Sequence, residues 1–182
     1  MEDFELDNLI ESKIEEYMKT SAFTDRKVTD TPTDDLQVVN KKYVDARYYG
    51  RMYLTGGQSI GAASDTKVAL NNTDFSQGVT ADLTNNQFTI QTAGIYAIIG
   101  QVWYSVGSVG DIHECYLKVN SSYITQGRTV SPTTNANSTL LYDLKNLNSG
   151  DTVQLWTQTS NGSGQSLLNG SGIYTYLEIY RI

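Results

Sequence analysis

The chain has 182 residues, enough for one domain of ordinary size and an appendage but not for two full domains. Its formal net charge is −7 and it has no basic stripe to neutralise phosphates, so we expect no nucleic-acid partner. No run approaches about 18 consecutive apolar residues, so we expect no membrane insertion, and one cysteine and one histidine exclude cysteine-cluster and multi-histidine metal sites.

Charge is unevenly distributed along the chain. Residues 1–50 hold 12 of the 20 acidic and 7 of the 13 basic side chains, whereas residues 51–182 hold 14 of the 15 glycines. We therefore predict a helical N-terminal part over 1–50 and a β-rich domain over 51–182.

A first helix is predicted from Glu2 to Lys19. Its apolar side chains recur every three or four residues, and we predict that their stripe docks the chain on a larger partner: Phe4, Leu6, Ile10, Ile14 and Tyr17. A lone helix of this length is marginal in water, so the stripe needs a covering surface, and the chain's own second part is the alternative. These first residues are acidic, whereas an export signal begins with basic residues followed by an apolar stretch, so we expect no export.

A second, shorter helix is predicted to begin near Asp34 or Asp35, after an extended connector over 20–33. Its apolar residues step by three, four and three, which is the seam of a coiled coil two heptads long: Leu36, Val39, Tyr43 and Ala46. We predict that this trimerising helix aligns three chains, although two heptads do not hold a coiled coil alone.

From Gly50 onward the pattern has the period of β-strands. Apolar and polar residues alternate over 88–91, 115–119 and 140–144, with turn-forming residues between the segments. This pattern predicts an antiparallel sandwich of eight to ten strands.

Two segments are apolar on both faces of the predicted strand. In 95–104 one parity carries Ile95, Ala97, Ile99 and Trp103, and the other carries Tyr96, Ile98, Val102 and Tyr104. In 173–180 one parity carries Ile173, Leu177 and Ile179, and the other carries Tyr174, Tyr176 and Tyr180. A sandwich strand of a monomer has one wet face, so we predict that neighbouring copies cover the tyrosines, which would form a trimer interface: Tyr96, Tyr104, Tyr174, Tyr176 and Tyr180. The alternatives are a covering helix, or tyrosines that lie half-exposed with their hydroxyls in water.

Three motifs in the β-rich part resemble the C1q/TNF-like jelly roll. They are FTIQTAGIY at 88–96, LKNLNSGDTV at 144–153 and the terminal apolar strand YLEIY at 176–180, in the order and spacing of that family over about 55–182. The resemblance implies a ten-stranded, two-sheet sandwich that forms a homotrimer, with aromatic residues of the central and last strands near the three-fold axis.

A second resemblance lies in the N-terminal part. The segment TPTDDLQVVNKKYVD at 31–45 is similar to a stretch of bacteriophage fibre and appendage proteins, where a short helix precedes a trimeric tip. The repetitive shaft of a long tail fibre is missing, so a short fibre, spike or capsid decoration fits better.

The sequence offers little for catalysis. The run Asp111, His113, Glu114 and Cys115 includes residues that bind metals or act as bases, but on a strand Glu114 points away from the other three. Cys115 also shares its parity with apolar residues, so we expect no catalytic residue, cofactor or metal.

Loops at the tip of the trimer are the predicted receptor contacts. Tyr123, Arg128 and Trp156, with the polar runs 133–138 and 160–166, offer hydroxyls, amides and aromatic rings of the kind that bind carbohydrate. The alternative is that these segments are simply polar loops.

Together these observations predict a non-enzymatic bacteriophage virion structural protein for host attachment. Its N-terminus would dock on capsid or tail proteins, as a head fibre, tail fibre or decoration, and its jelly roll would project outward, with a host-surface glycan as candidate ligand. The competing hypothesis is a cellular surface-adhesion or carbohydrate-binding module of the same fold. A third hypothesis is an enzyme that degrades a surface polysaccharide.

Overall fold

The computed structural model describes residues 47–105 and 107–182. Both predicted helices lie outside the described residues, as do the docking and alignment side chains assigned to them, namely Phe4, Leu6, Ile10, Ile14, Tyr17, Leu36, Val39, Tyr43 and Ala46. The described residues contain no helix that is long and apolar enough to cross a membrane.

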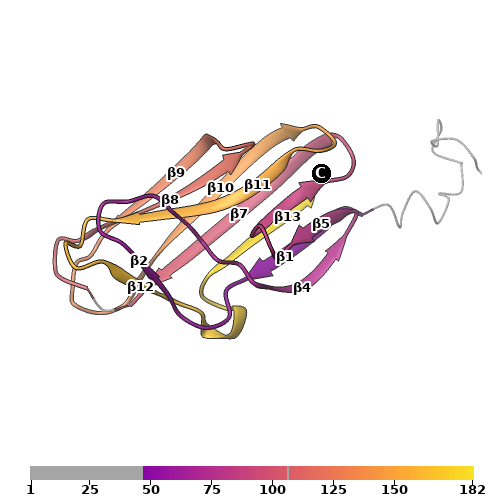
Figure 1. Ribbon diagram of the computed structural model, residues 1–182. Helices are drawn as coiled ribbons and strands as arrows, with labels where there is room; N and C mark the ends of the chain where they lie inside the picture. Colours follow the sequence, from indigo (N-terminus) through magenta and orange to yellow (C-terminus); the bar gives the residue numbers. More distant parts are fainter. Residues whose placement is uncertain (1–46, 106) are drawn as a thin grey trace, which may run out of the picture. The chain divides into compact units, whose positions relative to one another are not determined.

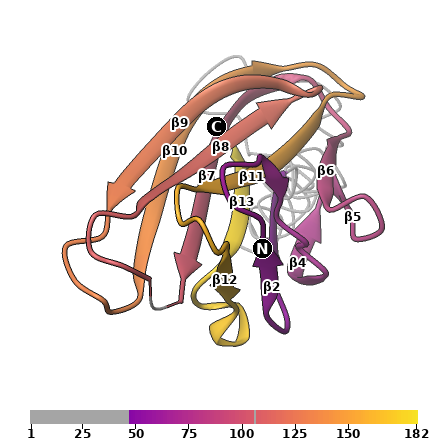
Figure 2. The same ribbon diagram turned by 60° about the vertical axis from the view of Figure 1, so that its left-hand side comes forward.

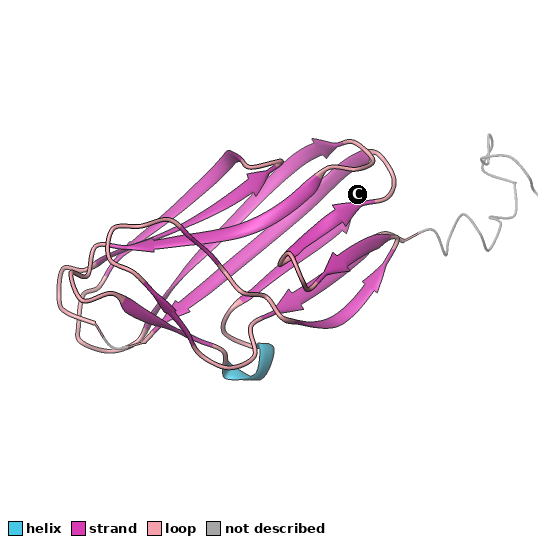
Figure 3. Ribbon diagram, viewed as in Figure 1, coloured by secondary structure: helices cyan, strands magenta, loops and turns pink. Residues whose placement is uncertain are grey.

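Thirteen strands make up nearly all the regular structure of the described residues (Figures 1 and 3). In chain order they are β1 (Tyr49–Tyr53), β2 (Gln58–Ile60), β3 (Thr66–Lys67), β4 (Asn72–Gln77), β5 (Val79–Asp82), β6 (Gln87–Ile90), β7 (Gly94–Tyr104), β8 (Ile112–Val119), β9 (Ser122–Val130), β10 (Asn137–Leu147), β11 (Thr152–Thr159), β12 (Gln165–Leu168) and β13 (Tyr176–Arg181). One short 3-10 turn, η1 (Gly170–Gly172), precedes β13.

The first layer is a seven-stranded sheet centred on β7. β10 pairs with one edge of β7 along its whole length, from Asn137 opposite Tyr104 to Leu147 opposite Gly94. The other edge of β7 pairs first with β13 and then with β12. β1 and β4 continue the sheet beyond β13, and β2 lies beside β12, as Figure 2 shows.

The second layer is a six-stranded antiparallel sheet in the order β5-β6-β11-β8-β9, with the two-residue β3 paired to β11. The long hairpin β8–β9 and its neighbour β11 form the larger half of this sheet. The edges β9 and β10 of the two layers meet through side chains, because the Thr129 hydroxyl donates to the Ser138 carbonyl at 3.0 Å.

Apolar residues of alternate parity fill the space between the sheets. Along β7 the side chains of Tyr96, Ile98, Val102 and Tyr104 are fully buried, whereas the residues of the other parity are exposed or half-buried. Leu155 of β11 and Leu117 of β8 face them from the other sheet, and β13, beside β7, adds Leu177 and Ile179. The mostly β sandwich predicted from the alternation is confirmed.

Two predictions about this part of the chain are wrong in detail. The sandwich has thirteen strands instead of ten, because pieces as short as β2 and β3 extend the sheets, and β1 already begins at Tyr49. Tyr96 and Tyr104 belong to the core instead of an outer surface, since each ring is fully buried between the sheets.

The two ends of the sandwich carry different parts of the chain. Tyr49 pairs with Tyr180, so the chain enters β1 and leaves β13 at the same end. The polar connections that follow β7, β9 and β11 lie at the opposite end, because Tyr104 pairs with Asn137 and Thr159 with His113.

Candidate functional site

The outer side of the seven-stranded sheet carries an apolar surface, which we call the apolar face. Its side chains come from five neighbouring strands: Ile95, Ala97 and Ile99 of β7; Leu140, Tyr142 and Leu144 of β10; Tyr176 and Tyr180 of β13; Tyr49 and Tyr53 of β1; and Phe75 of β4. The β10 residues are the most open, with Leu140 62% and Tyr142 57% exposed. Monomers rarely leave so large an apolar patch in water.

One ion pair lies in the middle of the apolar face. Arg51 Nε is 3.1 Å from Glu178 Oε1, and the guanidinium lies 4.4 Å from the centre of the Tyr176 ring. Tyr180 donates to Glu178 Oε2 at 3.1 Å. Burial, with the Glu178 charge as a second cause, raises the pKa of both Tyr176 and Tyr180, so their hydroxyls stay neutral.

The structure divides the five tyrosines predicted for a trimer interface. Tyr176 and Tyr180 lie on the apolar face, and Tyr174 stacks on Trp103 with ring centroids 4.6 Å apart just beyond its edge. On β7 the outward residues are the aliphatic ones, so Ile95, Ala97 and Ile99 take the places expected for tyrosines.

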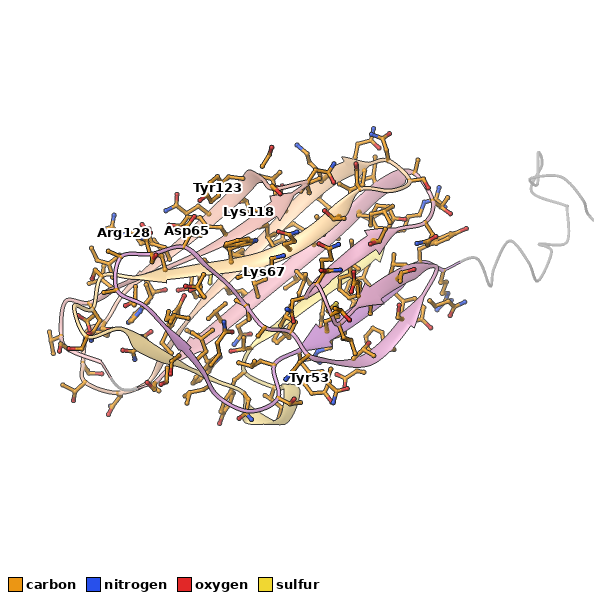
Figure 4. All side chains as sticks on the ribbon, in the orientation of Figure 1. Tyr53, Asp65, Lys67, Lys118, Tyr123 and Arg128 are labelled. Atoms are coloured by element: carbon orange, nitrogen blue, oxygen red, sulfur yellow. The ribbon has the colours of Figure 1, made fainter. Side chains whose placement is uncertain are left out.

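The outer side of the six-stranded sheet carries a different surface, built from aromatic and charged side chains (Figure 4). Lys118 Nζ lies 4.1 Å from the ring centre of Tyr123 and 3.8 Å from that of Trp156, and it pairs with Asp65 at 3.4 Å. Tyr123 also donates to Asp65 and stacks edge-on against Tyr116. These contacts fix the connection between β2 and β3 against β8 and β9.

Beside this cluster runs a polar depression, which we call the outer groove. Its larger hollow, about 480 Å³, is lined by Asp65, Tyr116, Tyr123, Ile124, Thr125, Gln126 and Gln158. A smaller one of about 170 Å³ adjoins it at Gln158 and is lined also by Ala63, Ile112, Glu114, Arg128, Thr159 and Ser160. The larger volume lies within the range of about 300–1,000 Å³ usual for small-ligand sites.

The three predicted receptor contacts lie on strands, not on tip loops. Tyr123 and Arg128 belong to β9 and line the outer groove. Trp156 belongs to β11 and is held between Lys118 and Lys67, with its Nε1 donating to Gln154 at 2.9 Å, so it supports the cluster without lining the groove. Asp65, Gln126 and Gln158 also line the outer groove, and the sequence pattern did not single them out.

The only histidine and the only cysteine of the chain lie in the core. His113 stacks on Tyr104 with centroids 4.2 Å apart, and its Nε2 is 3.0 Å from Ser131 Oγ. Burial raises the pKa of Cys115 to about 12, so its thiol is neutral and unreactive. Glu114 points outward, as predicted, and accepts from Tyr116 at 2.5 Å. Among residues 47–105 and 107–182 no three potential ligands gather closely enough to hold a metal ion.

Comparisons with known proteins give similarity of structure without similarity of sequence. No family model and no curated protein matches the sequence. Among solved structures, Eiger TNF from S. frugiperda has a TM-score of 0.58 at 12% identity, covering 75% of this chain and 92% of that one. Murine APRIL has 0.58 at 13%, covering 75% and 99%. The globular domain of zebrafish complement 1qA has 0.57 at 12%, covering 75% and 97%.

At such low identity the likeness concerns the fold alone. It spans nearly the whole length of each neighbour and three quarters of this chain. The three neighbours come from the two groups that the sequence motifs resemble. The described part of the chain therefore has a TNF/C1q-like jelly-roll fold.

Proposed function

We propose that this chain assembles into a homotrimer through its apolar face and that the trimer is a structural component of a bacteriophage particle. In this proposal it is a short fibre, spike or capsid decoration without catalytic activity, and its role is mechanical and adhesive. The observation that carries the proposal is the apolar face, where Leu140, Tyr142 and Leu144 are each at least half exposed in the single chain.

Two further copies of this chain are the partners best suited to cover the apolar face. The apolar face extends onto the edge strand β10, so the edge of one subunit and the face of the next can close a three-fold ring. Arg51 pairs with Glu178 at 3.1 Å and with Asp74 at 3.5 Å, so covering the face leaves the guanidinium with carboxylate partners. The resemblance of the sequence to C1q/TNF-like domains implies the same assembly.

The particle role rests on two further observations. Residues 31–45 resemble a segment of phage fibre and appendage proteins and precede β1 in the sequence. The polar connections lie at the opposite end. This arrangement suits a protein that attaches through its N-terminal part and displays the jelly roll outward.

Removal of residues 1–30 tests the attachment. Particles of the encoding phage, assembled from a genome with this gene interrupted, should bind added full-length protein and reject the truncated form. The truncated form should remain a trimer, because the apolar face lies within the jelly roll. Equal decoration of particles by both forms would contradict the proposed attachment.

A further inference from the structure

We propose that the outer groove binds a neutral oligosaccharide. The proposal gives a ligand class to the adhesive role proposed above and rests on it for biological context. It assigns recognition to the side of the six-stranded sheet instead of the tip of the assembly.

The groove is bounded by three separate parts of the chain. Its floor is formed by outward side chains of β8 and β11, namely Glu114, Tyr116 and Gln158. One wall is the connection between β2 and β3, with Ala63 and Asp65, and the other is β9. The two hollows meet at Gln158, so the groove is elongated, as a short chain of sugar rings requires.

The chemistry of the lining matches a sugar. Each sugar hydroxyl both donates and accepts a hydrogen bond, and the amides of Gln126 and Gln158 offer both functions. The Tyr123 ring is 57% exposed at the rim, and the C–H faces of a pyranose stack on such rings.

The charges in the groove favour a neutral sugar over an anionic one. Asp65 lines the larger hollow and Glu114 the smaller one, where Arg128 is the only basic side chain in the described lining. Lys118 pairs with Asp65 and Arg128 lies opposite Glu114, so the lining has no excess positive charge to attract a sialic acid, a uronic acid or a phosphate, whereas both carboxylates can accept hydrogen bonds from neutral hydroxyls.

The groove is organised before any ligand binds. Asp65 is held by Lys118 and by the Tyr123 hydroxyl, and the connection is anchored by the Ala63 amide, which donates to the Thr159 carbonyl at 2.8 Å. The Tyr116 hydroxyl donates to Glu114 at 2.5 Å and lies 3.0 Å from Gln158 Oε1, and these contacts hold the floor in place. A site held in this way loses little conformational entropy on binding.

Binding to an array of immobilised oligosaccharides tests the proposal with the full-length protein. The array should span neutral hexose and N-acetylhexosamine chains as well as uronic-acid and sialic-acid chains, and titration calorimetry should follow with the free sugars that bind. We expect at least one neutral chain to bind, and Tyr123→Ala and Gln126→Ala to weaken that binding about tenfold.

Gln91→Ala is the matched control, because Gln91 is an exposed glutamine whose amide contacts Thr80, outside the groove. It should bind as the unmodified protein does. Gln126→Ala keeps the test valid if Tyr123→Ala fails to fold, since Gln126 is an exposed side chain.

Three results would overturn the proposal: no binding of any neutral chain, binding of anionic chains only, or unchanged binding by a folded groove variant. Sedimentation of the same samples keeps the two proposals apart. A trimer that binds no sugar would remove the groove proposal alone, whereas a monomer that binds sugar through the groove would remove the trimer alone.

Discussion

His113 lies fully buried in the sandwich, and within the described residues its Nδ1 has no hydrogen-bond partner. Burial lowers the pKa of this histidine, and the nearby Asp111 charge opposes the shift only in part. Its ring stacks on Tyr104, whose own pKa is raised well above the usual value by burial. The core therefore holds two aromatic groups in their neutral forms.

The lowered pKa of His113 predicts a loss of stability in acid. Below the ordinary pKa of about 6.5 the unfolded chain binds a proton that the folded chain resists, so the free energy of unfolding falls between pH 7 and pH 5. Each unit between the folded and unfolded pKa values contributes about 1.4 kcal/mol. Urea unfolding of the unmodified protein and of His113→Phe at both pH values measures this effect.

The change in the free energy of unfolding between pH 7 and pH 5 is compared between the two proteins. The carboxylates titrate in both proteins, so the difference between the two changes reports on His113 alone. His113→Phe is expected to lose the Ser131 hydrogen bond at either pH, so this cost cancels in the comparison. An equal loss between pH 7 and pH 5 in both proteins would contradict the assignment.

At the scale of elements, β9 and β10 approach so closely that one glycine is required between them. A Cβ added at Gly127 would lie 2.9 Å from Leu141 Cδ2, 2.9 Å from Thr139 Cγ2 and 3.2 Å from the Leu140 carbonyl oxygen. Gly127→Val should therefore lower the free energy of unfolding by about 1–3 kcal/mol, measured by urea unfolding.

Gly162→Val is the control for crowding, because a Cβ at Gly162 meets no atom within 4 Å. Its effect should stay within about 0.5 kcal/mol. A Gly127→Val protein as stable as this control would show that the two edges leave room for a larger side chain at this position.

The alternation of apolar and polar residues predicts the strands. It does not predict which face of β7 is buried between the sheets and which face points outward. Both parities of 95–104 are apolar, and tyrosine is suited to an outer surface unless its hydroxyl finds a buried partner. Tyr104 finds one 2.7 Å away in Thr157 Oγ1, and Tyr96 donates to the Thr92 carbonyl at 2.7 Å. Such partners depend on tertiary structure, which residue spacing does not reveal.

The outer groove could not be predicted from the sequence, for a related reason. Tyr123 and Arg128 were recognised by residue type, but Asp65 and Gln158 join them only because β11 pairs with β8 and the chain before β3 crosses above them. One signal was present. Gln154, Trp156 and Gln158 alternate with the buried Leu155 and Thr157, which places all three on the outer side of β11.

At the scale of the whole molecule, the two candidate functional surfaces lie on different layers of the sandwich. The apolar face lies on the outer side of the seven-stranded sheet, and the outer groove lies on the other layer. Assembly through the first surface therefore leaves the second accessible. In the proposed trimer, this separation would leave the outer groove free to contact a ligand while the apolar face is covered.

The mass of the purified protein in solution tests the proposed assembly most directly. Three chains of 20.2 kDa sum to 60.6 kDa, and sedimentation equilibrium at micromolar concentration should give that mass. Tyr142→Lys, on the apolar face, should shift the protein toward 20.2 kDa, whereas Leu83→Lys, in the turn between β5 and β6, should leave the trimer intact. An unmodified protein that sediments as a folded species of 20.2 kDa would contradict the account.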